Sequence, residues 1–210
     1  MRDPVKKALV LCEGKEDKLV MLELARRAGI EGLLDFEAYD GKDKLRDYLN
    51  LLKARPEYTS GGHPRILVTR DADNNFESSW QALSTAVSEE MACTVEEPGK
   101  WCKTTGGTEI AAWIVPGVGR TGMIETMCVD SSERKAPEVF GCLGLFLECL
   151  DGVHGSAMHE KARFAIWTIA AQGTGAKDRL SLEYAIPNLP IDWDADAFQP
   201  LKDLLFSVAG

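Results

Sequence analysis

Two aspartates separated by one residue give the clearest chemical signal in the chain. Asp71 and Asp73 directly follow an apolar run, residues 66–68, that is typical of a buried strand. Open parallel α/β sheets bind their ligands beyond the carboxyl ends of the strands. Neighbouring carboxylates repel each other, and a cation that prefers oxygen ligands, Mg²⁺ or Mn²⁺, would offset that charge. A lone Asp-x-Asp is nevertheless common, with one aspartate capping a turn and the other solvated.

Further acids follow other expected strands. The apolar run 8–12 ends at Glu13 and Gly14, and a helical pattern that carries Asp17 near its start follows. Another apolar run, 110–115, leads through a glycine-rich loop to Glu125. Because the carboxyl ends of parallel strands lie along one edge of a sheet, we expect acids from these distant segments to meet. Such convergence is more specific than any single pair and predicts a magnesium site with one or two ions.

Basic residues are expected near the same edge. They either contact phosphates or are ordinary solvated charges. They are Lys15, Lys18, Arg65, Arg70 and Arg120. The glycine-rich loop 116–122 lies between a strand and a helix, where phosphates can bind, but it matches neither Gly-x-Gly-x-x-Gly nor the Walker pattern.

The elements that must position these residues alternate between strand and helix. Apolar patterns predict strands at 8–12, 33–39, 66–70 and 110–115, each followed by a helix, with 93–108 as a hairpin or surface loop. Helices are predicted at 139–150, 156–172, 181–186 and 196–208. The fold class is therefore α/β, with a mainly parallel, Rossmann-like sheet flanked by helices and with extra C-terminal helices. We expect residues 1–135 to form the core and 136–210 a helical extension packed on it, in one compact domain.

Composition limits the function classes. The chain has 210 residues and is 45% hydrophobic, which suits one domain with a sizeable core. Its net charge of −9 argues against tight non-specific binding to nucleic acid, although a local basic patch can exist. Six cysteines without a Cys-x-x-Cys pair exclude zinc-ribbon spacing. Without a signal peptide or a run of membrane-spanning length, we expect a cytoplasmic protein with no membrane partner.

Several motifs resemble the Toprim domain, whose pattern is a glutamate after the first strand and an Asp-x-Asp after a later one. Here these are Leu11-Cys12-Glu13-Gly14 and Thr69-Arg70-Asp71-Ala72-Asp73. The segment from Glu13 to Asp17 looks like the family's Glu-Gly-x-x-Asp form. Residues 115–125 and the tail from Pro190 look like small stand-alone relatives of the OLD (overcoming lysogenisation defect) nucleases.

The resemblance implies a Mg²⁺- or Mn²⁺-dependent nuclease acting on DNA or RNA. It implies that Asp71 and Asp73 hold magnesium and that Asp17 and Glu125 complete a second metal position. Glu13 would be a general acid or base, or a metal ligand, and Lys161 a basic helper. Lys15, Arg70 and Arg120 would contact the substrate. OLD nucleases carry a fused ATPase, so an ATPase or another protein is a candidate partner.

Other functions stay open at this stage. One is a non-catalytic module that binds metal or nucleic acid for a partner protein. Another is a phosphotransferase or phosphatase that uses the same acids on small nucleotides. The acids could also be merely structural.

Overall fold

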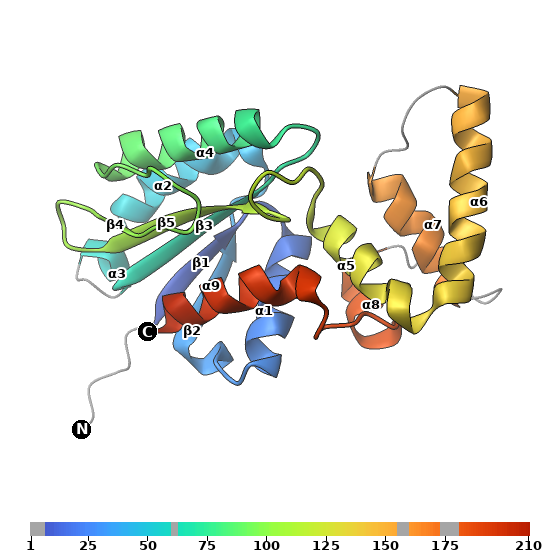
Figure 1. Cartoon of the computed structure of the whole chain (residues 1–210). Helices are drawn as coiled ribbons and strands as arrows, with labels where there is room; N and C mark the ends of the chain where they lie inside the picture. Colours follow the sequence, from blue (N-terminus) through green and yellow to red (C-terminus); the bar gives the residue numbers. More distant parts are fainter. Residues whose placement is uncertain (1–6, 60–62, 155–159, 173–180) are drawn as a thin grey trace.

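A computed structural model describes residues 7–59, 63–154, 160–172 and 181–210, and it shows helices on both faces of one sheet (Figure 1). Four strands are parallel, namely β1 (Ala8–Cys12), β2 (Leu34–Ala38), β3 (Arg65–Asp71) and β5 (Glu109–Val115). The short β4 (Cys102–Lys103) pairs with β5 in antiparallel fashion, so the segment before β5 is a hairpin. The strand order is β2-β1-β3-β5-β4, which confirms the predicted mainly parallel α/β fold.

The central strand β1 shows why these apolar runs become strands. All five of its residues are buried, as expected for a parallel strand that is covered on both faces. Successive side chains of a strand point to opposite faces. Val10 and Cys12 accordingly join one hydrophobic core, whereas Leu9 and Leu11 join the other.

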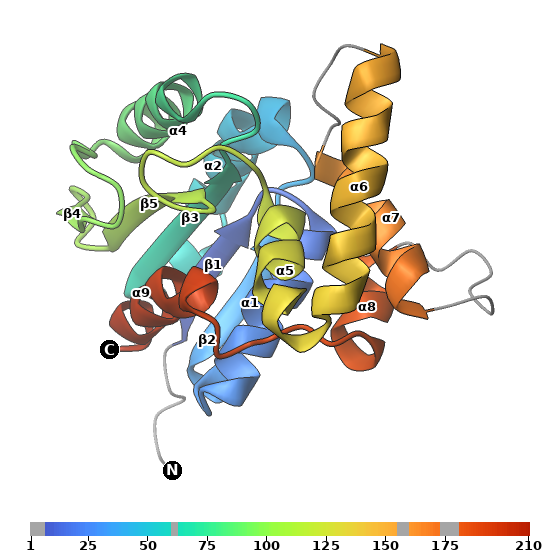
Figure 2. The ribbon, with the colours of Figure 1, turned by 45° about the vertical axis from the view of Figure 1, so that its right-hand side comes forward.

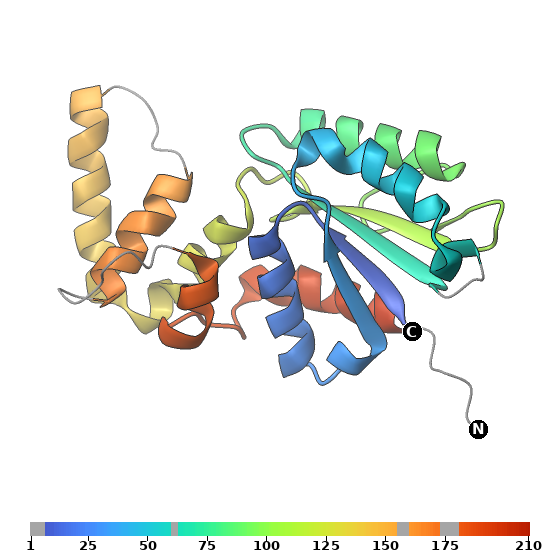
Figure 3. The same ribbon diagram turned by 180° about the vertical axis from the view of Figure 1, so that it is seen from behind.

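Helices cover each face of the sheet. The face of Val10 is covered by α1 (Lys15–Arg27), α5 (Ile124–Ser132) and α9 (Gln199–Ala209). The opposite face is covered by α2 (Leu45–Lys53) and α4 (Phe76–Met91), as Figure 3 shows from behind. The one-turn helix α3 (Pro56–Thr59) precedes β3. In the described part of the chain, these two layers of helix cover both faces of the sheet.

The C-terminal helices extend the core of α1 and α5. They are α6 (Pro137–His154), α7 (Glu160–Gln172) and α8 (Leu182–Asn188), and they lie toward the side to which the parallel strands run (Figure 2). Phe164 and Trp167 of α7 are buried in the same cluster as Val10. Residues 156–159, predicted to begin this helix, lie outside the described residues. In the part of the chain that is described, no helix is long and apolar enough to cross a membrane.

The chain after α8 returns to the sheet through an aromatic contact. Phe198 is fully buried and stacks on Trp193, with ring centroids 5.3 Å apart. The Arg27 guanidinium lies over the Trp193 ring, 5.2 Å from its centroid. This cluster therefore attaches α9 to the end of α1.

We expect Phe198→Ala to lower the free energy of unfolding by about 3–5 kcal/mol, because it leaves a cavity in the core. Phe206→Ala is the matched control, since Phe206 lies on α9 with its side chain 50% exposed. Urea denaturation followed by fluorescence measures both. Equal midpoints for the two variants would show that the aromatic cluster does not hold α9 in place.

Candidate functional site

The carboxyl ends of β1 and β3 form the crevice of this sheet. The chain leaves β1 toward β2 on one side and later enters β3 on the other side, so the order of the strands reverses at β1. Such a switch point is where open α/β sheets bind ligands. Glu13 follows β1 and Asp71 ends β3, and the Asp71 amide lies 3.4 Å from Glu13 Oε2, to which it donates. The first two predicted acids are therefore adjacent.

Asp17 is held in the same crevice by the first turn of α1. Its Oδ2 accepts a hydrogen bond of 3.0 Å from the Gly14 amide, and the residue is only 6% exposed. A Cβ atom at position 14 would lie 3.0 Å from this oxygen. The absence of a side chain at Gly14 thus lets the carboxylate approach the main chain that follows Glu13.

The loop between β5 and α5 fixes the Asp-x-Asp segment. The amide of Ala72 donates to the Val115 carbonyl at 2.8 Å, and that of Gly122 donates to the Asp73 carbonyl at 2.7 Å. Gly122 has a φ of 115°, and a Cβ there would lie 2.7 Å from Thr126 Oγ1. A larger residue at position 122 would therefore disturb the start of α5. The hydrogen bond from Gly122 to the Asp73 carbonyl therefore links Asp73 to α5, the helix that carries Glu125.

The five predicted acids act on one another electrostatically. Burial raises the pKa of Asp71 well above its ordinary range, and the charges of Asp17, Glu13, Glu125 and Asp73 raise it further. Burial, together with Glu125 and Glu13, raises the pKa of Asp17 to about 7, against the effect of the backbone hydrogen bonds. Burial also raises the pKa of Glu13, while the Asp71 amide and the nearby Arg70 oppose the rise. The structure therefore brings all five acids to one edge.

The five acids lie near one another, but their side chains do not converge on one point. Among the residues that the structure describes, no three His, Cys, Asp or Glu side chains are placed to hold a metal ion. Asp71 Oδ1 is buried and has no hydrogen-bond partner. A buried acceptor normally has a partner, and oxygen ligands with uncompensated charge suit a divalent cation. The residues fit such a cation in atom type and charge, and the carboxylates would turn toward it on binding.

The predicted basic residues have different environments. Arg70 is half-buried beside the acids, whereas Lys15 is exposed at the start of α1. Arg120 lies in the loop after β5, 3.8 Å from Asp130. Lys18 is half-buried in α1, close enough to Cys12 for its charge to oppose the rise of that thiol's pKa. Lys161 belongs to α7, and its side chain is outside the described part of the chain.

The prediction for Arg65 was wrong. Arg65 is the first residue of β3 and Asp71 is the last, so Arg65 lies at the amino end of the strand, away from the acids. It makes an ion pair with Glu109, the first residue of β5, at 2.9 Å. A strand of seven residues separates the two ends too far for Arg65 to reach the crevice.

Lys42 is a further basic residue at this edge, and no motif in the sequence predicted it. This residue begins a short 3-10 turn after β2, and its Nζ lies 3.4 Å from Asp73 Oδ2. The turn residues Asp40-Gly41, just before Lys42, indicate that the chain turns at the carboxyl end of the second strand. The argument that the ends of parallel strands share one edge applies to β2 as well.

Comparison with known proteins gives a family for the chain. A family model described as a protein of unknown function (DUF3226) matches residues 7–209. The chain belongs to the DUF3226 family. No curated protein and no solved structure matches this DUF3226 chain. Its match to the family includes the crevice and all the C-terminal helices.

The raised pKa of Asp17 predicts a pH-dependent stability in the absence of divalent cations. The ordinary pKa of an aspartate is 3.8, and that of Asp17 in the folded protein is about 7. At a pH between these two pKa values, Asp17 holds a proton in the folded protein that it has lost in the unfolded chain. The free energy of unfolding therefore falls as pH rises through this window. We expect Asp17→Asn to flatten this fall, which thermal unfolding in EDTA at a series of pH values measures.

Asp47→Asn is the control, because Asp47 is exposed on α2 and loses the same charge. If both variants show the wild-type dependence on pH, Asp17 does not retain its proton in the folded protein.

Proposed function

We propose that this chain is a Mg²⁺- or Mn²⁺-dependent Toprim-type nuclease that hydrolyses phosphodiester bonds of DNA or RNA. The observation that carries the proposal is the grouping of Asp71, whose buried Oδ1 has no partner, with four other acids at the switch point of the sheet. The resemblance of Glu13-Gly14 and of the Asp-x-Asp segment to the Toprim motifs supports it.

In this proposal the acids divide into two groups. Asp71, Asp73 and Glu13 would hold one cation, and Asp17 with Glu125 would complete a second position. When bound, such cations offset the charge of the phosphate and favour deprotonation of the attacking water. The main-chain contacts of Ala72 and Gly122 fix the backbone that carries the two aspartates.

Glu13 is suited to proton transfer. Hydrolysis removes a proton from the attacking water and supplies one to the leaving oxygen. A general acid or base works best when its pKa is close to the working pH, and burial moves the pKa of Glu13 upward from 4.5. Its hydrogen bond from the Asp71 amide keeps its carboxylate beside the aspartates. Lys161 stays a prediction as the basic helper.

The proposal is tested by cleavage of labelled single- and double-stranded DNA and RNA with Mg²⁺ or Mn²⁺. We expect Glu13→Gln and Asp71→Asn each to lower the rate by about 100-fold or more, since each removes a proton carrier or a charge at the reacting phosphate. Asp47→Asn is the control. Equal cleavage by all the proteins would exclude these acids from the reaction.

Cation binding can be tested without turnover. A ligand that binds only the native state raises its stability, and deprotonated carboxylates bind metal better. We therefore expect Mg²⁺ or Mn²⁺ to raise the melting temperature of the wild type more at pH 8 than at pH 5, and Asp71→Asn to reduce this gain. No gain at pH 8 would mean that the acids are structural.

The outcomes of the two tests separate the alternative functions. Cation binding without cleavage of any substrate would favour a non-catalytic module that serves a protein partner, such as an ATPase. Activity on small nucleotides but not on polymers would favour a phosphotransferase or phosphatase.

A further inference from the structure

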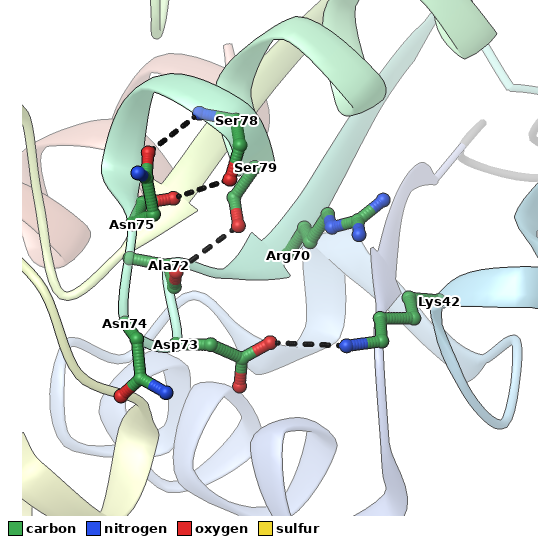
Figure 4. A pocket seen from close by; sticks show the side chains of 8 residues that line it. All are labelled: Lys42, Arg70, Ala72, Asp73, Asn74, Asn75, Ser78 and Ser79. Atoms are coloured by element: carbon green, nitrogen blue, oxygen red, sulfur yellow. Dashed lines mark hydrogen bonds and ion pairs between the residues drawn. The ribbon is translucent and has the colours of Figure 1, made fainter.

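A polar pocket lies beside the acids, between the end of β3 and the start of α4 (Figure 4). Its volume is about 370 Å³. The side chains that line it include Lys42, Arg70, Asp73, Asn75, Ser78 and Ser79. Because Asp73 belongs to both the pocket and the group of acids, a ligand could occupy both at once.

Arg70 is the unusual residue of this pocket. Its Nε atom is buried and has no hydrogen-bond partner, and its guanidinium makes no ion pair within the described part of the chain. Every other arginine whose side chain is described makes an ion pair with a carboxylate. The acids nearby balance part of its charge, since Arg70 opposes the rise in the pKa of Glu13, but the buried Nε–H still lacks an acceptor, and a buried donor normally has one. Arg70 therefore indicates an anionic ligand.

The surroundings of Arg70 favour the same charge. Lys42 reaches into the pocket from the turn after β2 and touches Asp73 only at 3.4 Å (Figure 4). The sixteen-residue helix α4 starts at the pocket, where Asn75 Oδ1 caps the Ser78 amide at 2.9 Å. The positive end of a helix dipole adds to the two cations. The pocket thus has two cationic side chains and one acid.

The adjoining cavity adds no further unpaired cation among the described residues. Arg46 lines it, but this arginine pairs with Glu89 at 2.6 Å, and Asp43 contributes a negative charge. An anion would therefore be placed at Arg70 and Lys42.

The pocket suits a phosphate better than a base. None of the side chains that line it is aromatic, whereas proteins bind unpaired bases by stacking them on aromatic rings. Contacts from arginine, lysine, serine or asparagine to phosphate oxygens position a nucleic acid but carry no sequence information. The hydroxyls of Ser78 and Ser79 already donate to main-chain carbonyls. Lys42 and Arg70 are therefore the main donors for a ligand.

We propose that this pocket binds a backbone phosphate of the nucleic-acid substrate, next to the phosphate that reacts at the acids. Arg70 is its principal ligand and Lys42 the second. The inference rests on the proposed nuclease function and adds that recognition here is independent of base sequence. It also explains how a chain with a net charge of −9 can hold a polyanion.

The first test uses inorganic phosphate in EDTA, so that it depends on neither cations nor cleavage. We expect phosphate to raise the melting temperature of the wild type more than chloride of equal ionic strength does. Phosphate also stabilises proteins by exclusion from their surface. The quantity to compare is therefore the gain in melting temperature of each variant relative to that of the wild type. Arg70→Gln should lose the specific part of the gain, whereas Arg26→Gln, an arginine paired with Glu23 on α1, should keep it. An equal gain in all three proteins would overturn the proposal.

The second test measures binding of labelled oligothymidine and oligoadenosine at several salt concentrations, with Ca²⁺ in place of Mg²⁺ and intact substrate verified on a gel. We expect Arg70→Gln to weaken binding of both oligonucleotides by about 10-fold. It should also reduce the slope of log affinity against log salt by about one. Lys42→Gln, at an exposed position, should cause a smaller loss in the same direction. Arg26→Gln should change neither quantity.

The combined outcomes distinguish this inference from the proposed function. Wild-type affinity and slope in Arg70→Gln would overturn the phosphate pocket even if the wild type cleaves nucleic acid. Phosphate and oligonucleotide binding that depend on Arg70, without cleavage, would support the pocket and exclude the nuclease. Binding of phosphate but of no oligonucleotide would overturn the assignment to nucleic acid.

Discussion

Mutual repulsion among buried carboxylates is the constraint on which the rest of this structure depends. Asp17, Asp71 and Glu125 are each less than one-tenth exposed, and they lie at the ends of segments that are distant in the chain. Removing such groups from water and placing them together disfavours their charged forms. The sheet must therefore hold them in place by other means. The all-buried strand β1, the close approach at Gly14 and the contact of Gly122 with Asp73 do so.

The fold was predictable because its signals are local and regular. Apolar runs of strand length alternate with helical patterns, and such alternation leads to a parallel sheet. The position of the acids after those runs then predicted a common edge, and Glu13 does lie against the Asp71 amide. One geometric rule, that the carboxyl ends of parallel strands are neighbours, was enough to predict from the sequence where these two acids lie.

The sequence could not predict which partners individual side chains have or in which direction they point. The predicted strand 66–70 already separates Arg65 from Arg70, since one precedes it and the other ends it, but it does not indicate what their side chains contact. Arg65 pairs with Glu109 across the sheet, whereas Arg70 has a buried Nε atom without a partner. The lack of a partner depends on every residue nearby, so no local pattern indicates it. The directions of the carboxylates, which do not meet at one point in the part of the chain described, are set in the same way.

The C-terminal helices pack against the two helices that carry buried acids. Helix α8 packs on α1, and the Leu182 amide donates to Glu16 Oε1 at 3.3 Å, one residue before Asp17. Helix α7 packs on α5, the helix that carries Glu125, and Cys128 on α5 is completely buried. These helices therefore cover α1 and α5, the two helices that carry Asp17 and Glu125. The side of the crevice at Lys42 and Arg70 stays open as a polar pocket. Burial raises the pKa of Asp17. On the open side, the positive charges of Lys42 and Arg70 suit an anionic ligand. The helical extension and the sheet thus shape one site together.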